Sequence, residues 1–261
     1  EKQPAFVALR NTYLRGFLSF KFADWLMGPY FYKVYEAKGL SPSDIGNIFL
    51  CGFLSAMVFG TFIGGATDRI GRRTGCQICA LFFCLSCLST LSNNYFVLLL
   101  GRFLGGSASS LLHSAFESWV VCEHKARDLP EDSRSVLFGL VTLGDGVVAI
   151  AAGFTAQAAR DVVGLTGPFL CSVCLLCIGG TYVSVSWVEN YGSASFSGLQ
   201  NFELAFRALV NEPRIMVLGC ITALFEGSMY TFVFLWSSVL QRSFGIHHNE
   251  LPLGMVFSCF M

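Results

Sequence analysis

The stretch GGATDRIGRRT, residues 64–74, decides the fold, because it sets a short polar turn between long apolar runs at about 44–66 and 75–92. A helix needs about 20 mostly apolar residues to cross the roughly 30 Å hydrocarbon core of a bilayer. The flanking runs are close to this length. The stretch therefore predicts two membrane-spanning helices joined by a positively charged turn.

Apolar runs of similar length continue on both sides of this helix pair. Seven spans are predicted, at about 13–35, 44–66, 75–92, 95–121, 135–159, 166–188 and 213–240, and an eighth begins near Leu251. Strands of a membrane barrel would be about half as long and would alternate in polarity. The predicted fold class is an all-α polytopic membrane protein with a six-helix N-terminal bundle, span seven and the start of span eight.

The composition supports this class, since 54% hydrophobic and only 13% charged residues do not suit a water-facing surface. The 17 basic and 17 acidic residues cancel, so we expect the lipid bilayer as a partner and no nucleic acid. Cysteines with metal-ligand spacing, such as Cys76 and Cys79, lie inside apolar runs and are interpreted as packing residues. No phosphate-binding loop or nucleophile motif is visible. We predict no metal, no cofactor and no enzymatic activity.

Basic residues indicate the orientation, because Lys and Arg concentrate in cytoplasmic loops. With the N-terminus inside, the inner segments carry Lys2, Arg10, Arg69, Arg72, Arg73, Lys125, Arg127, Arg134, Arg207 and Arg214. The outer segments carry Lys38, Arg160 and Arg242. This bias predicts a cytoplasmic N-terminus, and we expect a multi-pass protein of the plasma membrane.

The chain divides into a six-helix half at 1–190, a connector at 191–212 and the start of a second half at 213–261, which we expect to be incomplete because it ends inside an apolar run. Within the connector, apolar residues recur at helical spacing opposite polar ones. The apolar set is Leu199, Phe202, Phe206, Leu209 and Val210, and the polar set is Gln200, Asn201, Glu203 and Arg207. This amphipathic helix either lies in the membrane interface or packs on the cytoplasmic face of the bundle.

Ionisable residues inside the spans are functional hypotheses, because a charge in the bilayer is costly. On spans one and four, polar residues fall within a stripe of about 80° at 100° per residue. The candidates for a central cavity are Lys21, Asp24, Tyr32, Arg102, Ser109, His113, Glu117, Asp145, Glu226 and Tyr230. The alternative is that Lys21 pairs with Asp24, or Arg102 with Asp145, only to assemble the bundle, and that His113 is a packed core histidine.

The 64–74 stretch resembles the signature loop of the major facilitator superfamily, a Gly-x-x-x-Asp-Arg-x-Gly-Arg-Arg pattern between spans two and three. The matching residues are Gly64, Asp68, Arg69, Gly71, Arg72 and Arg73. A gating role would suit them: Gly64 and Gly65 would permit close helix approach, Gly71 a tight turn, and Asp68 would face a helix N-terminus or an arginine.

A second stretch, GRFLGGSASS at 101–110, resembles the arginine-containing motif of the superfamily's fourth helix. Small residues continue along this helix at Gly106, Ser110, Ser114 and Ser118, which predicts close packing against a neighbouring helix. Span five carries Gly144-Asp145-Gly146 where antiporter members have a Gly-Pro pair, which weakens a drug-antiporter interpretation. Together the two motifs imply a major facilitator-type bundle.

Three longer stretches, FADWLMGPYFYKVYE (22–36), YFVLLLGRFLGGSASSLLHSAFESWVVCEH (95–124) and ALFEGSMYTFVFLWSSVL (223–240), resemble the molybdate-anion transporter branch of this superfamily. That resemblance implies molybdate uptake. A tetrahedral dianion needs positive charge and N–H or O–H donors, which Lys21, Tyr32, Arg102, Ser109, Ser110 and Tyr230 could supply. Asp24, Glu117 and Glu226 would repel it when ionised, which suggests coupling to protons.

Three functions therefore remain open. The first is a secondary transporter that moves molybdate or a similar oxyanion by alternating access between two six-helix halves. The second is an organic-solute or sugar carrier of the same superfamily, for which aromatic-rich cavity faces would serve equally well. The third is a membrane sensor that keeps the fold without transporting.

Overall fold

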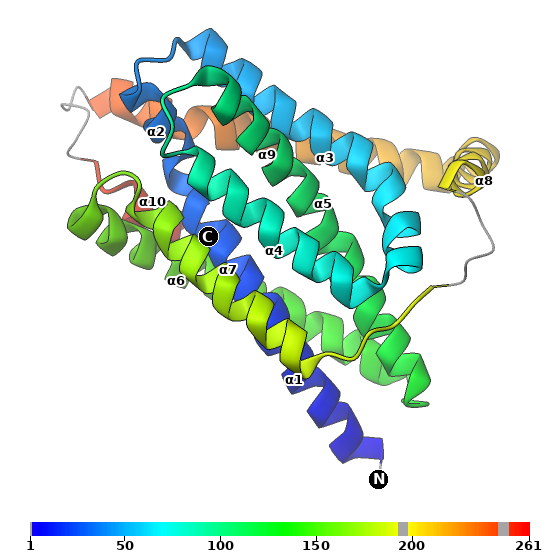
Figure 1. Cartoon of the computed structure of the whole chain (residues 1–261). Coiled ribbons are helices and arrows are strands. Elements are labelled where there is room, and N and C mark those ends of the chain that lie inside the picture. The colour runs from blue at the N-terminus through cyan, green and yellow to red at the C-terminus, as the bar shows by residue number, and fades with distance from the viewer. Residues whose placement is uncertain (1, 193–197, 245–250) are drawn as a thin grey trace.

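The computed structural model describes residues 2–192, 198–244 and 251–261, and it is helical throughout, with no strand in these ranges (Figure 1). Its elements are α1 (Lys2–Met27), the 3-10 turn η1 (Gly28–Tyr30), α2 (Phe31–Ala37), α3 (Pro42–Ile70), α4 (Arg72–Ser89), α5 (Tyr95–Ala126), α6 (Glu131–Val163), α7 (Gly167–Ser186), α8 (Gly198–Asn211), α9 (Pro213–Phe244) and α10 (Leu253–Phe260). The predicted all-α class is confirmed.

Five of the described helices, α3, α5, α6, α7 and α9, are long and apolar enough to cross a membrane by length and composition. The other two helices at predicted spans, α1 and α4, fall short of that apolar composition. Their sequences explain this, since α1 carries Lys21 and Asp24 and α4 begins with Arg72 and Arg73. Both helices pack against several others, so their polar faces can point into protein instead of lipid.

The first span differs from the single helix predicted at 13–35. The helix begins at Lys2 and stops at Met27, where η1 interrupts it before α2 continues to Ala37. Pro29 causes the break, because proline has no N–H to donate and its ring clashes with the carbonyl group of the preceding turn. The Gly28-Pro29 pair was a visible signal of this interruption. The break places Tyr30 and Phe31 at the interior of the bundle, where both are buried.

The six helices of the first half pack as two connected groups. In one group α5 contacts α3 and α4, in the other α1 contacts α6 and α7, and α4 contacts α7 between them. The α3–α5 contact is especially close, since a Cβ atom at Gly106 would collide with the carbonyl oxygen of Gly52. Ser110 Oγ donates a hydrogen bond across this contact to the carbonyl oxygen of Ala56, at 2.7 Å. The predicted close packing of the small-residue face is confirmed at these positions.

Aromatic side chains fill the bundle near the ends of α5 and α7. The rings of Trp119 and Trp187 stack with centroids 3.8 Å apart, and both side chains are fully buried. Phe116 meets Trp187 edge to face at 5.5 Å. This cluster joins α5 to the segment that follows α7, and so holds that segment against the bundle.

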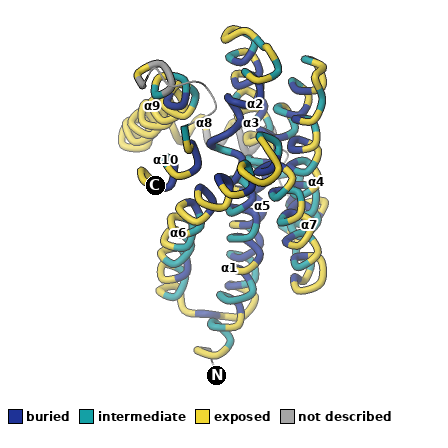
Figure 2. Tube along the Cα trace, turned by 90° about the vertical axis from the view of Figure 1, so that its left-hand side faces the viewer, coloured by how far each residue is buried: buried dark blue, intermediate teal, exposed yellow. Residues whose placement is uncertain are grey.

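The second half begins with α9, whose residues between Arg214 and Tyr230 are all exposed (Figure 2). The connector helix predicted at 191–212 is present as α8, which contacts α3 and α9. Leu209 and Val210 on its apolar face are exposed, whereas the side chains of Leu199 and Phe202 lie outside those described. α10 packs on α6 and η1.

Candidate functional site

A central cavity of about 320 Å³ lies between α1, α3, α4, α5 and α9. It is the place where the two polar stripes predicted on spans one and four meet a face of span seven. Of the predicted cavity residues, those that line it are Lys21, Asp24, Arg102, Ser109, His113, Glu226 and Tyr230. Aromatic rings, including Phe31, Phe49 and Phe53, make up much of the remaining wall.

Arg102 is the cavity residue with the most unusual surroundings. Its guanidinium carbon lies 4.2 Å from the ring centroid of Phe31 and 4.9 Å from that of Phe49. Its Nε is buried and has no hydrogen-bond partner among the described residues. Ring faces attract a desolvated cation by on the order of 2 kcal/mol, but they accept no directed hydrogen bonds of the kind an oxygen accepts. Arg102 therefore keeps N–H donors available inside a partly apolar cavity.

Lys21 pairs across the bundle with Asp145 of α6, with 3.4 Å between Lys21 Nζ and Asp145 Oδ2. Trp25 Nε1 donates a hydrogen bond to the other oxygen of this carboxylate at 2.7 Å. This differs from both pairings considered from the sequence, Lys21 with Asp24 and Arg102 with Asp145. The reason is geometric: Lys21 and Trp25 lie one turn apart on α1 and face α6 together, whereas Arg102 faces the rings of Phe31 and Phe49.

Three of the predicted residues lie elsewhere. Tyr32 does not line the central cavity, because its ring is buried edge to face against Phe234, with centroids 5.7 Å apart. Glu117 and Asp145 line a second cavity of about 200 Å³ between α1, α5 and α6. Helical spacing placed Tyr32 on the same stripe as Lys21, but the break at Pro29 turns α2 out of register with α1.

The 64–74 turn lies at the end of the bundle that carries Gly71, Arg127 and Glu189, which we call the motif end. Gly71 has a φ of 112°, which confirms the predicted tight turn. Asp68 accepts a hydrogen bond from Arg72 Nε at 2.8 Å, so it faces an arginine as expected. Arg69 is exposed. The expectation of close helix approach fails at Gly64, where an added Cβ would have no described neighbour within 4 Å.

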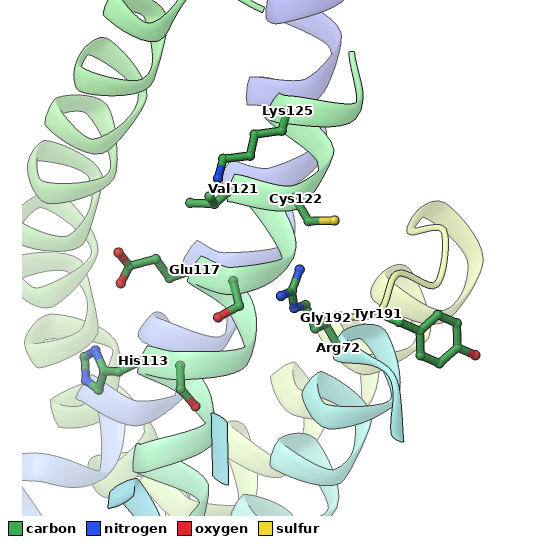
Figure 3. Close-up of a pocket in the computed structure, with 10 residues that line it drawn as sticks. Arg72, His113, Glu117, Val121, Cys122, Lys125, Tyr191 and Gly192 are labelled. Carbon is green, nitrogen blue, oxygen red and sulfur yellow. The ribbon is translucent and has the colours of Figure 1, made fainter. Parts of the chain in front are cut away.

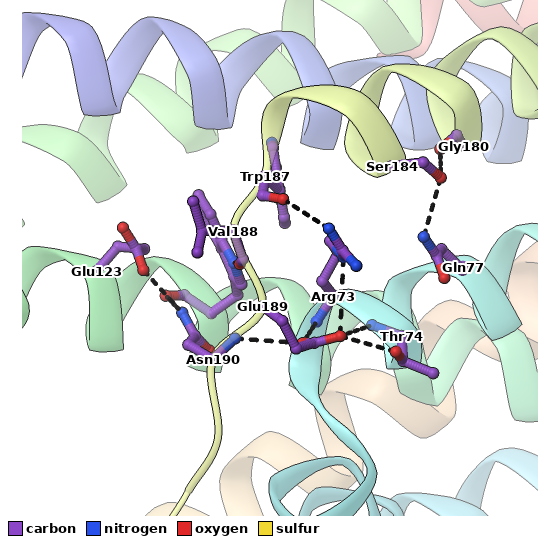
Figure 4. Close-up of polar contacts among 11 residues, drawn as sticks. Arg73, Thr74, Gln77, Glu123, Gly180, Ser184, Trp187, Val188, Glu189 and Asn190 are labelled. Carbon is purple, nitrogen blue, oxygen red and sulfur yellow. Dashed lines mark hydrogen bonds and ion pairs between the residues drawn. The ribbon is translucent and has the colours of Figure 1, made fainter.

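Glu189, which the sequence did not single out, binds the start of α4 (Figure 4). Its carboxylate accepts hydrogen bonds from the backbone N–H of Arg73 at 2.7 Å and of Thr74 at 3.1 Å, and from Thr74 Oγ1 at 2.7 Å. The first N–H groups of a helix have no partner within the helix, and a negative charge there is favourable. Glu189, which lies in the segment after α7, thus accepts hydrogen bonds from the otherwise unpaired backbone N–H groups at the N-terminus of α4.

The residues around Glu189 extend this contact. Arg73 lies 3.8 Å from the Glu189 carboxylate and donates to the carbonyl oxygen of Trp187 at 3.2 Å. Asn190 Nδ2 donates to Glu123 Oε1 on α5, also at 3.2 Å. The only signal in the sequence was an acidic residue at the cytoplasmic end of span six, on the same predicted side as the basic turn. The network ties α4, α5 and α7 together at the motif end.

A third cavity, of about 430 Å³, opens at the motif end (Figure 3). Arg72 and Gly192 line one side, and α5 contributes His113, Glu117 and Lys125. His113 and Glu117 project to the same side of α5, away from Arg72. This cavity is more polar than the central one, which fits a water-filled opening.

A family model described as sugar transporters with 12 transmembrane segments matches residues 1–261. The chain belongs to this major facilitator family. Among curated proteins, this family member is 39% identical over 262 residues to the molybdate-anion transporter of Xenopus tropicalis. The matched region covers 99% of this chain and 56% of that protein. It is 35% identical to the molybdate-anion transporter of Takifugu rubripes, covering 99% of the chain and 58% of that protein.

The chain thus spans a little over half the length of the curated relatives it matches. Among solved structures, the D-xylose-proton symporter superimposes with a TM-score of 0.63 at 15% identity, covering 97% of this chain and 66% of that one. This likeness shows the shared fold. The described part of the chain also has five helices that are long and apolar enough to cross a membrane. Together with the family match, they identify a multi-pass integral membrane protein.

In this major facilitator protein, α10 contacts η1 and α6 toward the end opposite the motif end. That opposite end carries Lys38, Asn93 and Gly164. Tyr30 Oη donates to Gln157 Oε1 at 2.8 Å, and the backbone N–H of Gly254 donates to Gln157 Oε1 at 3.2 Å. Ser258 Oγ donates to the carbonyl oxygen of Ile150 at 2.8 Å. Hydrogen bonds therefore join η1, α6 and α10 on this side, and the third cavity opens at the motif end.

Proposed function

We propose that this chain forms part of a secondary transporter that moves molybdate or a similar tetrahedral oxyanion across the membrane by alternating access. The observation that carries the proposal is Arg102, whose guanidinium rests on two aromatic rings and whose Nε has no partner among the described residues. A planar guanidinium matches oxyanions particularly well, because it donates several N–H bonds in a fixed fork.

Other donors in the central cavity support the same ligand class. Ser109 and Tyr230 carry hydroxyl groups, and Lys21 carries a second positive charge. Asp24 and Glu226 line the same cavity and would repel a dianion when ionised. We therefore propose that protons accompany the substrate. The relatives named as molybdate-anion transporters favour molybdate among the possible oxyanions.

The two ends of the bundle suggest a state within the transport cycle. The Tyr30–Gln157–Gly254 hydrogen bonds hold η1, α6 and α10 together toward the opposite end, and the third cavity opens at the motif end. Basic loop residues favour a cytoplasmic motif end and N-terminus, and we propose the plasma membrane as the location. In this orientation, the opening at the motif end supports an inward-open state, which we include in the proposal.

A second candidate is an organic-solute or sugar carrier. The aromatic wall formed by Phe31, Phe49 and Phe53 favours it, since flat apolar surfaces suit the faces of sugar rings, and the family model is described as sugar transporters. The two candidates differ in the role of Arg102. An oxyanion carrier needs its charge, whereas a carrier of neutral solutes needs only hydrogen-bond donors.

The test is uptake of labelled molybdate by molybdate-depleted cells that express the protein from its complete reading frame. We expect uptake that unlabelled tungstate inhibits strongly, sulfate less strongly and neutral sugars not at all. Replacing Arg102 with Gln should abolish most of the uptake, whereas Arg127→Gln, at an ion-paired surface position, should not.

Three outcomes would contradict the proposal. Unchanged molybdate uptake by Arg102→Gln would remove its main substrate contact. Inhibition by sugars instead of tungstate would favour the organic-solute carrier. Loss of molybdate-dependent signalling in cells lacking the protein, with no loss of flux, would favour a membrane sensor.

A further inference from the structure

Three side chains connect the three cavities of this half. Lys21 lines the central cavity and the second cavity, and Glu117 lines the second and the third. His113 lines all three. Its side chain is accessible from these cavities. Since His113 and Glu117 project to the same side of α5, titratable groups follow one another from the central cavity to the motif end (Figure 3).

The Lys21–Asp145 pair lies at the inner end of this series, and its two partners differ in exposure. The Lys21 side chain is 6% exposed and the Asp145 side chain is 30% exposed. The carboxylate can therefore exchange a proton with water in the second cavity, while the ammonium is shielded. Lys21 Nζ also lies 4.9 Å from the ring centroid of Trp25, the residue that holds the other carboxylate oxygen. As long as Asp145 is ionised, it keeps Lys21 turned toward α6.

We propose that Asp145 is a proton-binding site that decides whether Lys21 is available to the oxyanion, and that His113 and Glu117 pass this proton between the second cavity and the motif end. The inference rests on the proposed function. A proton that adds to the Asp145 carboxylate makes a neutral acid, and the Lys21 ammonium loses its counter-charge. The ammonium then turns to the oxyanion in the central cavity.

Release of the oxyanion reverses these steps, and the proton bound by Asp145 is released as well. The oxyanion leaves, and the proton passes from the Asp145 carboxyl group to a ring nitrogen of His113 or to the Glu117 carboxylate. From there it passes to water in the third cavity. The Asp145 carboxylate is ionised again and recovers the Lys21 ammonium. Each cycle thus moves a proton with the oxyanion in the same direction.

The other charged and titratable groups that line these two cavities come from three helices. On α1 these are Asp24 in the central cavity and Tyr13 in the second, and on α5 they are Arg102, His113 and Glu117. From α9, Glu226 and Tyr230 face the central cavity. Asp145 differs from Asp24 and Glu226 because its carboxylate is bound to a lysine that itself lines the central cavity. Its protonation is therefore coupled directly to a substrate-facing cation.

The experiment uses the protein from its complete reading frame in proteoliposomes and compares two rates. One is molybdate exchange at equal pH on both sides, which needs no net proton movement. The other is uptake driven by an inward proton gradient, where one pH unit can raise accumulation by up to about tenfold for each coupled proton. We expect Asp145→Asn to keep exchange and to lose the acceleration by the gradient.

Asp132→Asn is the matched control, because it removes an exposed carboxylate from the first turn of the same helix, and Asp132 lines none of the three cavities. It should behave as the wild type in both measurements. His113→Gln and Glu117→Gln should slow the gradient-driven uptake more than they slow exchange. If the gradient accelerates uptake by Asp145→Asn as much as it does by the wild type, Asp145 is not the proton site. If gradient-driven uptake is unchanged in both His113→Gln and Glu117→Gln, these residues are not the proton route.

An unpaired Lys21 can prevent Asp145→Asn from folding, so the double variant Lys21→Gln/Asp145→Asn is a second test that removes both charges. Its exchange should be weaker, and its ratio of driven uptake to exchange should not respond to the gradient. A ratio that responds as in the wild type contradicts the inference. If the wild-type protein exchanges no molybdate, the proposed function fails instead, so the two failures are distinguishable.

Discussion

The arginines of the central cavity and of the motif end have opposite surroundings. At the motif end, Arg72 is bound to Asp68 and Arg73 to Glu189. In the cavity, Arg102 lies on the rings of Phe31 and Phe49, and no carboxylate of the described residues forms an ion pair with it. An arginine bound to a carboxylate holds helices together, whereas one held only by aromatic faces remains available to a ligand. This difference separates structural charges from a binding charge within one chain.

The largest expected effects come from replacing Arg102, which should reduce substrate binding, and Arg72, which should reduce stability. Arg102→Gln should weaken molybdate binding by about 10- to 100-fold, since hydrogen bonds to charged groups contribute roughly 1.5–3 kcal/mol. Its thermal stability in detergent should change little. Arg72→Gln should lower the melting temperature and leave the affinity near that of the wild type. Binding and melting curves measured on both variants check the comparison, and equal loss of affinity in the two would refute it.

The next effect concerns the turn that positions the motif-end arginines. Gly71→Ala should lower the free energy of unfolding by about 2 kcal/mol, because a side chain is strained at this φ. The new Cβ would also lie 2.5 Å from the carboxyl carbon of Glu189. Gly164→Ala separates the two causes, since Gly164 has a φ of 93° and no described neighbour within 4 Å of an added Cβ. It should cost less, and an equal cost would show that only the backbone conformation matters.

A smaller effect is expected for the carboxylate that binds the start of α4. Glu189→Gln keeps an oxygen that can accept one N–H bond but loses the charge, so we expect a loss of about 1 kcal/mol in stability. Glu203→Gln is the control, because Glu203 and Arg207 form an exposed i, i+4 pair on α8 worth about 0.3–0.5 kcal/mol. Denaturation of the two variants under identical detergent conditions gives the difference. Equal losses would mean that Glu189 acts only as a surface charge.

The smallest expected loss of stability concerns the contact between α3 and α5. Ser110→Ala removes the hydrogen bond to the carbonyl oxygen of Ala56, and such bonds between membrane helices contribute about 0.6 kcal/mol. Ser114→Ala, which removes a bond within α5 to the carbonyl oxygen of Ser110, should cost less. Melting temperatures that fall in the reverse order would contradict the assigned role of the Ser110 contact.

Much of the fold could be predicted because bilayer thickness fixes the length of an apolar run. The same periodicity placed Lys21, Asp24, Arg102 and Ser109 on inward faces, and the structure brings all of them to the central cavity. The register was lost only beyond Pro29, where a broken helix no longer follows 100° per residue.

Partnerships between distant residues could not be predicted in this way. Lys21 pairs with Asp145 because α1 and α6 are neighbours, and periodicity within one helix contains no information about which helix lies beside it. Glu189 was missed for a related reason. It lies outside any apolar run, and its role depends on where the segment after α7 meets α4.

The Glu189 contact also has a consequence for the order of synthesis, because its two sides are 116 residues apart in sequence. At about 5–20 residues per second, the start of α4 leaves the ribosome roughly 6 to 23 s before Glu189 does. During that interval the N-terminus of α4 lacks the carboxylate that later accepts its N–H bonds. The contact between the 64–74 turn and Glu189 can therefore form only after the sixth span has been made, so it belongs to a late step in the assembly of the first half.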